Sequence, residues 1–189
     1  SLLSGSGREY EGRHVTMDKG EHRSAEYLRI NPNHQVPTLI DGTVKIHETN
    51  AMRRYVCLKQ ELIDWYPSDP LARAGIEQWL DWNQCRLSPA VVDIVLNGVF
   101  LGDQRDAIAI ERGKTRLSEL EPILEATLSR SSFVAGSRPT IADLSLASSI
   151  FQLRLADISL PGEGTRRWFE RMSELEGFRR SLPSVLAAG

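Results

Sequence analysis

Glu48 and Thr49 form a pair of residues whose types and spacing suit the binding of a small charged ligand. Thr49 is a plausible N-cap for a helical run that follows it. The first turn of a helix offers unpaired N–H groups and the positive end of the helix dipole, which suits a carboxylate. The adjacent Glu48 carboxylate suits an ammonium group. The pair therefore predicts a site for a peptide-like ligand that is zwitterionic at one end.

A loop and a β-hairpin are expected to position this helix start. Pro37 cannot donate to a strand ladder, so it should stand where a strand over residues 38–40 begins. Asp41-Gly42 between two apolar runs is a strong hairpin signal, and residues 43–47 alternate as a half-buried strand does. An X–Pro bond between a loop and a strand can be cis, which would leave the backbone groups of Val36 unpaired and facing outward.

These residues, in this order and spacing, resemble the glutathione-binding half of the glutathione transferase family. The stretch at residues 19–24, Lys-Gly-Glu-His-Arg-Ser, is similar to the theta-like and bacterial members. The motifs that carry the resemblance are Asn31-Pro32, Val36-Pro37 and Glu48-Thr49-Asn50-Ala51.

The resemblance implies a role for each matching residue. The Val36–Pro37 bond would be cis, and the Val36 backbone would pair with the cysteinyl unit of glutathione. Glu48 and Thr49 would hold the γ-glutamyl group, and two further positions match residues that reach the glycine carboxylate. The implied glutathione-binding residues are His22, Gln35, Val36, Pro37, Glu48 and Thr49.

The catalytic residue that activates the glutathione thiol is unknown from this sequence. In the resembled family a Ser, Tyr or Cys follows a first strand, and this sequence begins after that position; Ser1, Ser4 and Ser6 fall too late. Either the sequence lacks its true beginning, or the protein has lost the activating residue. We favour the first explanation, because without that strand the sheet would have three strands and an exposed face.

Composition narrows the class of protein. The 189 residues are 41% hydrophobic and 25% charged, with a net charge of −2 and a pI of about 6.1, so neither nucleic acid nor an anionic membrane is an expected partner. No apolar run spans a bilayer and no signal peptide is visible, which favours a cytoplasmic protein. The four histidines lack metal-ligand spacing, so we expect no metal site.

The two cysteines are expected in helices of a protein from a reducing compartment. Cys57 and Cys85 form no paired motif. We expect Cys85 to be a small buried hydrophobe. We also expect its thiol to be unreactive, because no histidine or helix N-terminus lies near it.

The fold class expected from the resemblance is an α/β thioredoxin-like N-terminal domain followed by an all-α helical C-terminal domain. The first domain would cover residues 1–64 and be incomplete at its N-terminus, with a linker at 65–70 and the helical domain at 71–189. Its pieces would be a strand over residues 9–17 and helices over 25–30 and 49–62. Beyond the linker we expect helices over about 70–97, 105–129, 144–155, 165–175 and 177–186.

The helical half contributes two further expectations. Thr140 and Asp143 have capping-box spacing ahead of a strongly apolar helix, which indicates a role in folding. The resemblance implies that the helix after Pro70 lines the pocket for the electrophile, with Asn83 and Arg86 as pocket residues. Trp79 and Trp82 on the same helix are expected in the core.

The function implied by the resemblance is conjugation of the glutathione thiolate to a small apolar electrophile, as in detoxification. Glutathione would be a co-substrate, with no prosthetic group. The resemblance also implies a homodimer to which the helix from Thr49 contributes through Met52, Arg53 or neighbours. Arg53-Arg54 would be a solvated face or a dimer contact. Two alternatives remain: a non-catalytic binding or scaffold protein of this fold, and a glutathione-dependent isomerase or dehalogenase.

Overall fold

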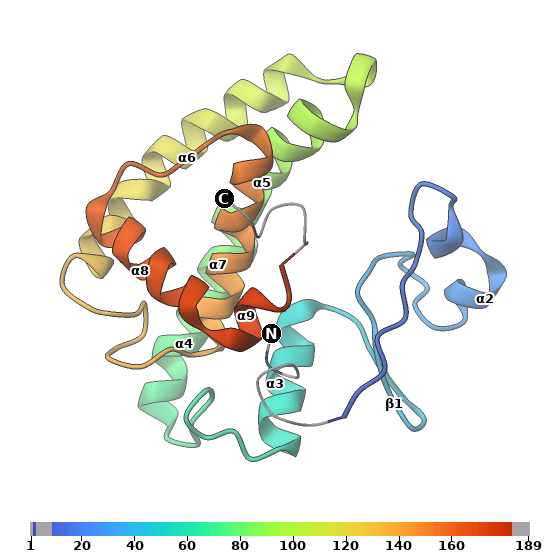
Figure 1. Cartoon of the computed structure of the whole chain (residues 1–189), viewed down its shortest axis with the longest axis horizontal. Coiled ribbons are helices and arrows are strands. Elements are labelled where there is room, and N and C mark those ends of the chain that lie inside the picture. Colours follow the sequence, from blue (N-terminus) through green and yellow to red (C-terminus); the bar gives the residue numbers. More distant parts are fainter. Residues whose placement is uncertain (1, 3–8, 183–189) are drawn as a thin grey trace.

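The computed structural model describes residue 2 and residues 9–182. Within them the chain forms a helical part, made of the residues from 70 onward, and a smaller N-terminal part that carries the strands (Figure 1). Helix α3, Thr49–Lys59, lies where the two parts meet and contacts α7 of the helical part. The fold class predicted from the sequence, a thioredoxin-like part followed by a helical part, is confirmed.

The N-terminal part is built around one antiparallel hairpin. Strand β1, Leu39–Asp41, pairs with β2, Val44–Ile46, so that Leu39 lies opposite Ile46. Gly42 in the turn has φ +59°, a left-handed conformation that glycine adopts without a Cβ clash. A single 3₁₀ turn, Glu21–Arg23, precedes the short helix α2, Ala25–Leu28, whose N-cap Ser24 accepts a hydrogen bond from the Tyr27 N–H. The predicted hairpin is therefore confirmed.

One expected strand and two expected helix ends in the N-terminal part differ from the structure. The strand expected over residues 9–17 is wrong: residues 9–16 form neither helix nor strand, because the described sheet has only β1 and β2 and pairs with no third strand. Helix α2 stops at Leu28, two residues before the expected end. Helix α3 stops at Lys59, and Glu61 just beyond it has φ +53°, which interrupts the helical path.

The helical part consists of long segments that match the predicted ones closely. Pro70 occupies the first turn of α4, where its missing N–H costs no hydrogen bond. The helix continues without a break to Phe100, past the expected end at 97, and includes two π-helical segments. The bounds are Pro70–Trp82 (α4), Asn83–Leu87 (π), Ser88–Val95 (α5), Leu96–Phe100 (π), Gly102–Gln104 (3₁₀), Ala107–Leu128 (α6), Ile141–Leu153 (α7), Arg154–Ala156 (3₁₀), Glu163–Glu174 (α8) and Glu176–Arg179 (α9). The last part of the helix expected over 177–186 lies outside the described residues.

Helix α7 occupies the centre of the core. All its residues are buried except Ser148 and Gln152, and it contacts α3, α4, α5 and α8. A helix that is apolar on every side has to be enclosed by other elements, and the bundle in Figure 1 surrounds it in this way.

The start of α7 is a complete capping box. The Thr140 side chain accepts from the Ala142 N–H, and the Asp143 carboxylate accepts from the Thr140 N–H at 2.8 Å. Asp143 is fully buried and also accepts from the Val134 N–H and from the Trp168 indole, each at 2.9 Å. Burial raises the pKa of the Asp143 carboxyl, and these hydrogen bonds, which favour the charged form, oppose that rise. The capping box thus ties α7 to the preceding loop and to α8.

Arg53 and Arg54 hold α3 against the helical part. Arg53 donates to the Asn50 side chain at 2.8 Å and to the Ser148 hydroxyl at 3.3 Å, and burial lowers the pKa of its guanidinium to about 10. Arg54 donates from Nε to Glu77 of α4 at 2.9 Å, and Tyr66 donates to the same carboxylate at 2.7 Å. The expectation of a solvated face is therefore wrong for this pair, since both side chains bond within the chain.

Replacing Thr140 by Ala should lower the free energy of unfolding by about 0.5–2 kcal/mol, because the cap of a buried helix loses its side-chain acceptor. Chemical denaturation measures this change. Thr115→Ala, which removes an exposed hydroxyl within α6, is the control and should have an effect near zero. Equal losses for the two variants would contradict the capping role.

Replacing Glu77 by Gln should destabilise the protein by about 1–2 kcal/mol at pH 7, since Arg54 loses a charged acceptor. The Arg54 guanidinium lowers the pKa of Glu77 below its ordinary value, so this stabilisation is present above the ordinary pKa and is lost as the pH falls through the lowered one. Denaturation curves from pH 7 to pH 3 should therefore show wild type and variant converging. Asp64→Asn, at an exposed ion pair with Arg138, should change little at any pH.

Candidate functional site

The first turn of α3 is open to a ligand. The helix begins at Thr49 and its cap position is Glu48, one residue earlier than predicted, and the Glu48 side chain makes no capping hydrogen bond. Glu48 has φ +69° and ψ 111°, an uncommon conformation for a residue with a side chain. Both Glu48 and Thr49 are exposed. An anionic group at this end would meet unpaired N–H groups and the positive end of the helix dipole, beside a carboxylate.

The loop before β1 contains the second predicted element of the site. The Val36–Pro37 peptide bond is cis, as the sequence predicted. Val36 is half-buried, whereas Pro37 and the Gln35 side chain are exposed. The Gln35 carbonyl oxygen accepts hydrogen bonds from the buried side chains of Tyr27 and Asn31.

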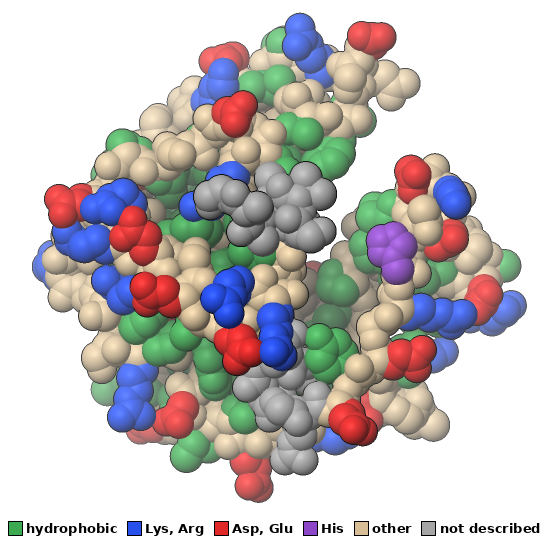
Figure 2. Space-filling model, in the orientation of Figure 1, with side chains coloured by type: hydrophobic (Ala, Val, Ile, Leu, Met, Phe, Trp, Pro, Cys, Tyr) green, Lys and Arg blue, Asp and Glu red, His purple; other side chains and the backbone are tan. Residues whose placement is uncertain are grey.

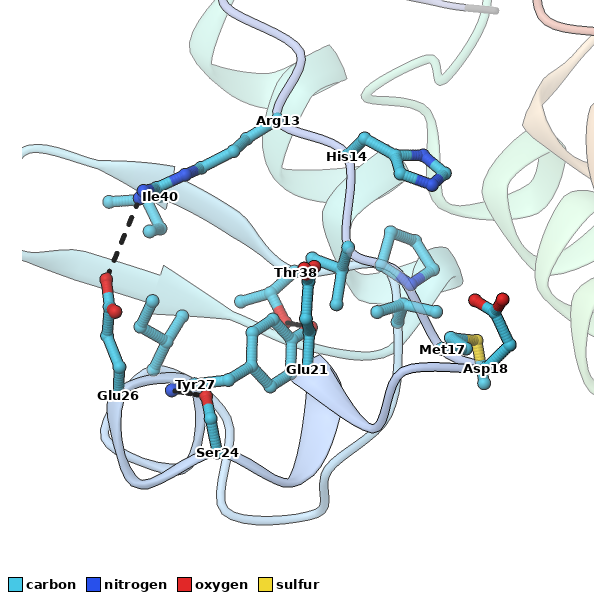
Figure 3. Close-up of a pocket in the computed structure, with 14 residues that line it drawn as sticks. Arg13, His14, Met17, Asp18, Glu21, Ser24, Glu26, Tyr27, Thr38 and Ile40 are labelled. Carbon is cyan, nitrogen blue, oxygen red and sulfur yellow. Dashed lines mark hydrogen bonds and ion pairs between the residues drawn. The ribbon is translucent and has the colours of Figure 1, made fainter.

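A cavity of about 1010 Å³ lies on one side of this loop (Figure 3). Val36 and Pro37 line it, together with residues 13–15, Met17 and Asp18, part of α2, and Ile40 of β1. The other four predicted glutathione-binding residues do not line it. The surface is also indented between the N-terminal part and the helical part, as Figure 2 shows. On that face acidic and basic side chains are interspersed, so no patch of one sign marks a partner.

His22 lies in the 3₁₀ turn and is half-buried. Its Nε2 accepts from Arg23 Nε at 3.3 Å, and its ring centroid lies 6.5 Å from that of His34. Its Nδ1 is buried and has no hydrogen-bond partner among the described residues. The role of His22 in binding the glycine carboxylate stays a prediction.

The two residues expected in an electrophile pocket have different surroundings. Asn83 is buried, at 4% exposure, and donates to the Ser145 hydroxyl at 2.9 Å, which in turn donates to Asn50 Oδ1 at 2.9 Å. Arg86 is exposed on the next turn. The chain of hydrogen bonds from Asn83 therefore runs through α7 to the second residue of α3. Sequence reasoning missed Ser145, which has no signal beyond its place in a buried helix.

Trp79 and Trp82 lie where the sequence predicted. Trp79 is buried and Trp82 packs against the same core, with the two ring centroids 5.2 Å apart in an edge-to-face arrangement. Their packing against the core positions the helix that carries Asn83.

Among the described residues, no cluster of three His, Cys, Asp or Glu side chains could hold a metal ion. The helices within residues 9–182 include none that combines the length and apolar character needed to cross a bilayer.

Comparison with known proteins identifies the family. Residues 1–57 match the model of the glutathione S-transferase N-terminal domain, and residues 87–176 match that of the C-terminal domain. Glutathione S-transferase 2 of Anopheles gambiae is 33% identical over 166 residues, which cover 85% of this chain and 76% of that protein. The chain belongs to the glutathione S-transferase family.

Solved structures of this family share the fold along most of the chain. A delta-class glutathione transferase of Nilaparvata lugens superposes with a TM-score of 0.87 at 26% identity, covering all of this chain and 87% of the other. The theta-class enzyme of Xanthomonas axonopodis pv. citri, solved with glutathione bound, has a TM-score of 0.80 at 27% identity and covers 87% and 80%. The resemblance and the enzyme class predicted from the sequence, a glutathione transferase, are confirmed.

The two cysteines of this glutathione transferase lie in different environments. Cys57 lies in the core on α3, and burial raises the pKa of its thiol to about 11. The expectation that Cys85 is buried is wrong. The buried positions of its helix, Leu80, Asn83 and Leu87, recur every three or four residues, and Cys85 falls between them on the exposed side.

The two thiols should therefore react at very different rates with an aromatic disulfide reagent at pH 8. Cys85 should react at once, whereas Cys57 should react only as the protein unfolds, because it is inaccessible and almost wholly protonated. Absorbance under native conditions should show one fast equivalent per chain, and Cys85→Ser should abolish it. A fast equivalent that survives in Cys85→Ser would contradict this description of Cys57.

Proposed function

We propose that this transferase binds glutathione at the start of α3 and along the loop at residues 35–37, and conjugates its thiolate to a small apolar electrophile. The observation that carries the proposal is the open N-terminus of α3 beside the exposed Glu48 carboxylate. The γ-glutamyl group has one carboxylate and one ammonium on a single carbon, which matches a helix start with a carboxylate next to it.

The assignment of individual groups follows from charge. The ligand carboxylate lies at the N–H groups of Thr49 and the next residue, and the ammonium lies at Glu48. The backbone of Val36 pairs with the cysteinyl unit, and Gln35 and His22 reach the glycine carboxylate. The structure of the theta-class relative described above was solved with glutathione bound, which supports glutathione as the co-substrate.

The chemistry requires a thiolate, since the neutral thiol is a poor nucleophile. A donor near the sulfur would lower the thiol pKa by hydrogen-bonding the charged form. No described residue is assigned that role. Glutathione acts as co-substrate, with no prosthetic group in the proposal.

The remaining expectations are part of the same proposal. Arg86 lies on the exposed side of the helix that would line an electrophile pocket. Asn83 is a buried residue of the same helix and would support that pocket from the core. A homodimer, a cytoplasmic location and a role in detoxification follow from membership of the family. Because Met52 and Arg53 contact residues within the chain, a dimer contact from α3 would come from their neighbours. The domain division at residues 64 and 71 also remains a proposal.

The alternatives weighed from the sequence gain no support from the comparisons. The relatives described above are named as glutathione transferases, and none is named as an isomerase, a dehalogenase or a scaffold protein.

Replacing Glu48 by Ala should weaken glutathione binding by about 1–3 kcal/mol, because the ligand ammonium loses a charge-assisted hydrogen bond. Isothermal titration calorimetry on wild type and variant measures the difference. Glu119→Ala, which removes an exposed carboxylate from α6, should leave the affinity unchanged. If wild type shows no binding, or if both variants bind as wild type does, this site is wrong.

A further inference from the structure

Two buried side chains of the N-terminal part hold the loop that carries Val36. Tyr27 is 8% exposed and Asn31 is fully buried. The Tyr27 hydroxyl donates to the Gln35 carbonyl at 2.7 Å, and the Asn31 amide donates to the same oxygen at 2.9 Å. A single carbonyl with two buried donors has both of its lone pairs occupied and little freedom to rotate.

The same two side chains also reach the other end of the loop. Thr38 Oγ1 lies 3.0 Å from the Tyr27 hydroxyl and 3.2 Å from the Asn31 amide nitrogen. Since Tyr27 has one proton and donates it to Gln35, the Thr38 hydroxyl is the donor in the first of these contacts. Figure 3 shows Tyr27 extending from α2 toward Thr38. Tyr27 and Asn31 thus bridge Gln35 to Thr38 across Val36 and Pro37.

Asn31 is itself held in place. Its side-chain oxygen accepts from the backbone N–H of Asn33 at 3.0 Å and from the Asn33 side chain at 3.1 Å. All of its polar groups therefore have partners, which is what a fully buried amide requires. Its two donors point toward Gln35 and Thr38 as a result.

This bridge determines the direction of the Val36 backbone groups. In a trans peptide the carbonyl and the N–H lie in one plane and point in opposite directions. The Gln35–Val36 bond is trans, since the cis bond found is Val36–Pro37. With the Gln35 carbonyl fixed toward Tyr27 and Asn31, the Val36 N–H points away from them. The contacts of Thr38 Oγ1 hold the chain on the other side of Pro37.

We propose that Tyr27 and Asn31 are positioning residues, which set the orientation of the Val36 backbone and thereby its pairing with the cysteinyl unit of glutathione. The inference rests on the proposed function, since Val36 is the group through which these residues act. The Tyr27 hydroxyl can be tested separately from the Tyr27 ring, because phenylalanine would fill the same space without the hydroxyl that joins Gln35 and Thr38.

The test is a mutant–ligand cycle on the full chain. Tyr27→Phe should weaken glutathione binding about 3- to 10-fold in calorimetry, the scale of one well-oriented hydrogen bond. The second ligand is glutathione with a trans alkene in place of its cysteinyl–glycyl amide, so that no cysteinyl carbonyl is present to accept a hydrogen bond from the Val36 N–H. Its affinity should differ less than about 2-fold between wild type and Tyr27→Phe, because the interaction that the hydroxyl orients is already lost.

Matched variants separate positioning from a general loss of stability. Tyr55→Phe removes another partly buried hydroxyl of the N-terminal part, which bonds Asp41 at 2.7 Å and has no contact with the loop. It should lower the melting temperature and leave glutathione affinity unchanged. Thr38→Val, which removes the other end of the bridge, should weaken binding in the same direction as Tyr27→Phe.

Each other outcome overturns the inference. Wild-type affinity in Tyr27→Phe would show that the hydroxyl does not orient the loop. Equal losses in Tyr27→Phe and Tyr55→Phe, or an equal loss for both ligands, would show a merely structural role. If wild type itself fails to bind glutathione, the proposed function falls together with the inference, whereas the first three results leave that function standing.

Discussion

Helix α3 has to be packed along one face and open at its first turn, and the site depends on both properties. Met52, Val56 and Cys57 are buried against the core, so that the helix cannot shift along its axis without losing apolar contacts. Its first turn, at Glu48 and Thr49, is exposed. A helix N-terminus attracts an anion only where solvent or ligand reaches it, and it positions that anion only where the helix is rigid.

The polar contacts between α3 and the helical part also hold the packed face of the helix in place. Arg53 is half-buried and bonds neutral oxygens of Asn50 and α7, whereas Arg54 bonds the Glu77 carboxylate. Removing a cation from water without giving it a carboxylate partner is costly, and desolvation lowers the pKa of Arg53 accordingly. The Asn50 side chain also accepts from Ser145, so the second residue of α3 is tied to the centre of the helical part. The helical part, whose central helix α7 begins with the Thr140–Asp143 capping box, therefore holds the start of α3 at which we propose that the ligand binds.

The sequence predicted best those features that local chemistry determines. The hairpin followed from Asp41-Gly42, the start of α4 from Pro70, and the capping box from Thr140 and Asp143, because each depends on residues close together in the chain. The family motif Val36-Pro37 predicted the cis bond between these residues. Residues 9–16 were predicted wrongly because a strand depends on a partner, which its own residues do not encode.

The remaining differences arise from packing between distant segments. Arg53 resembles a surface residue in the sequence because charge suggests solvent, and only its contact with Ser148, 95 residues further along the chain, explains why it is half-buried. Cys85 was misplaced because its helix buries a neighbouring stripe. The bridging role of Tyr27 was equally invisible, since no local pattern indicates that its hydroxyl reaches the loop at residues 35–38.

The most direct measurement of the central claim is an amide NMR titration of the protein with glutathione. The site described here predicts that the largest shifts fall on the N–H groups of Val36, Thr49 and Asn50, with small shifts along α6 and α8. Shifts that cluster on the helical part, with the start of α3 unchanged, would contradict it.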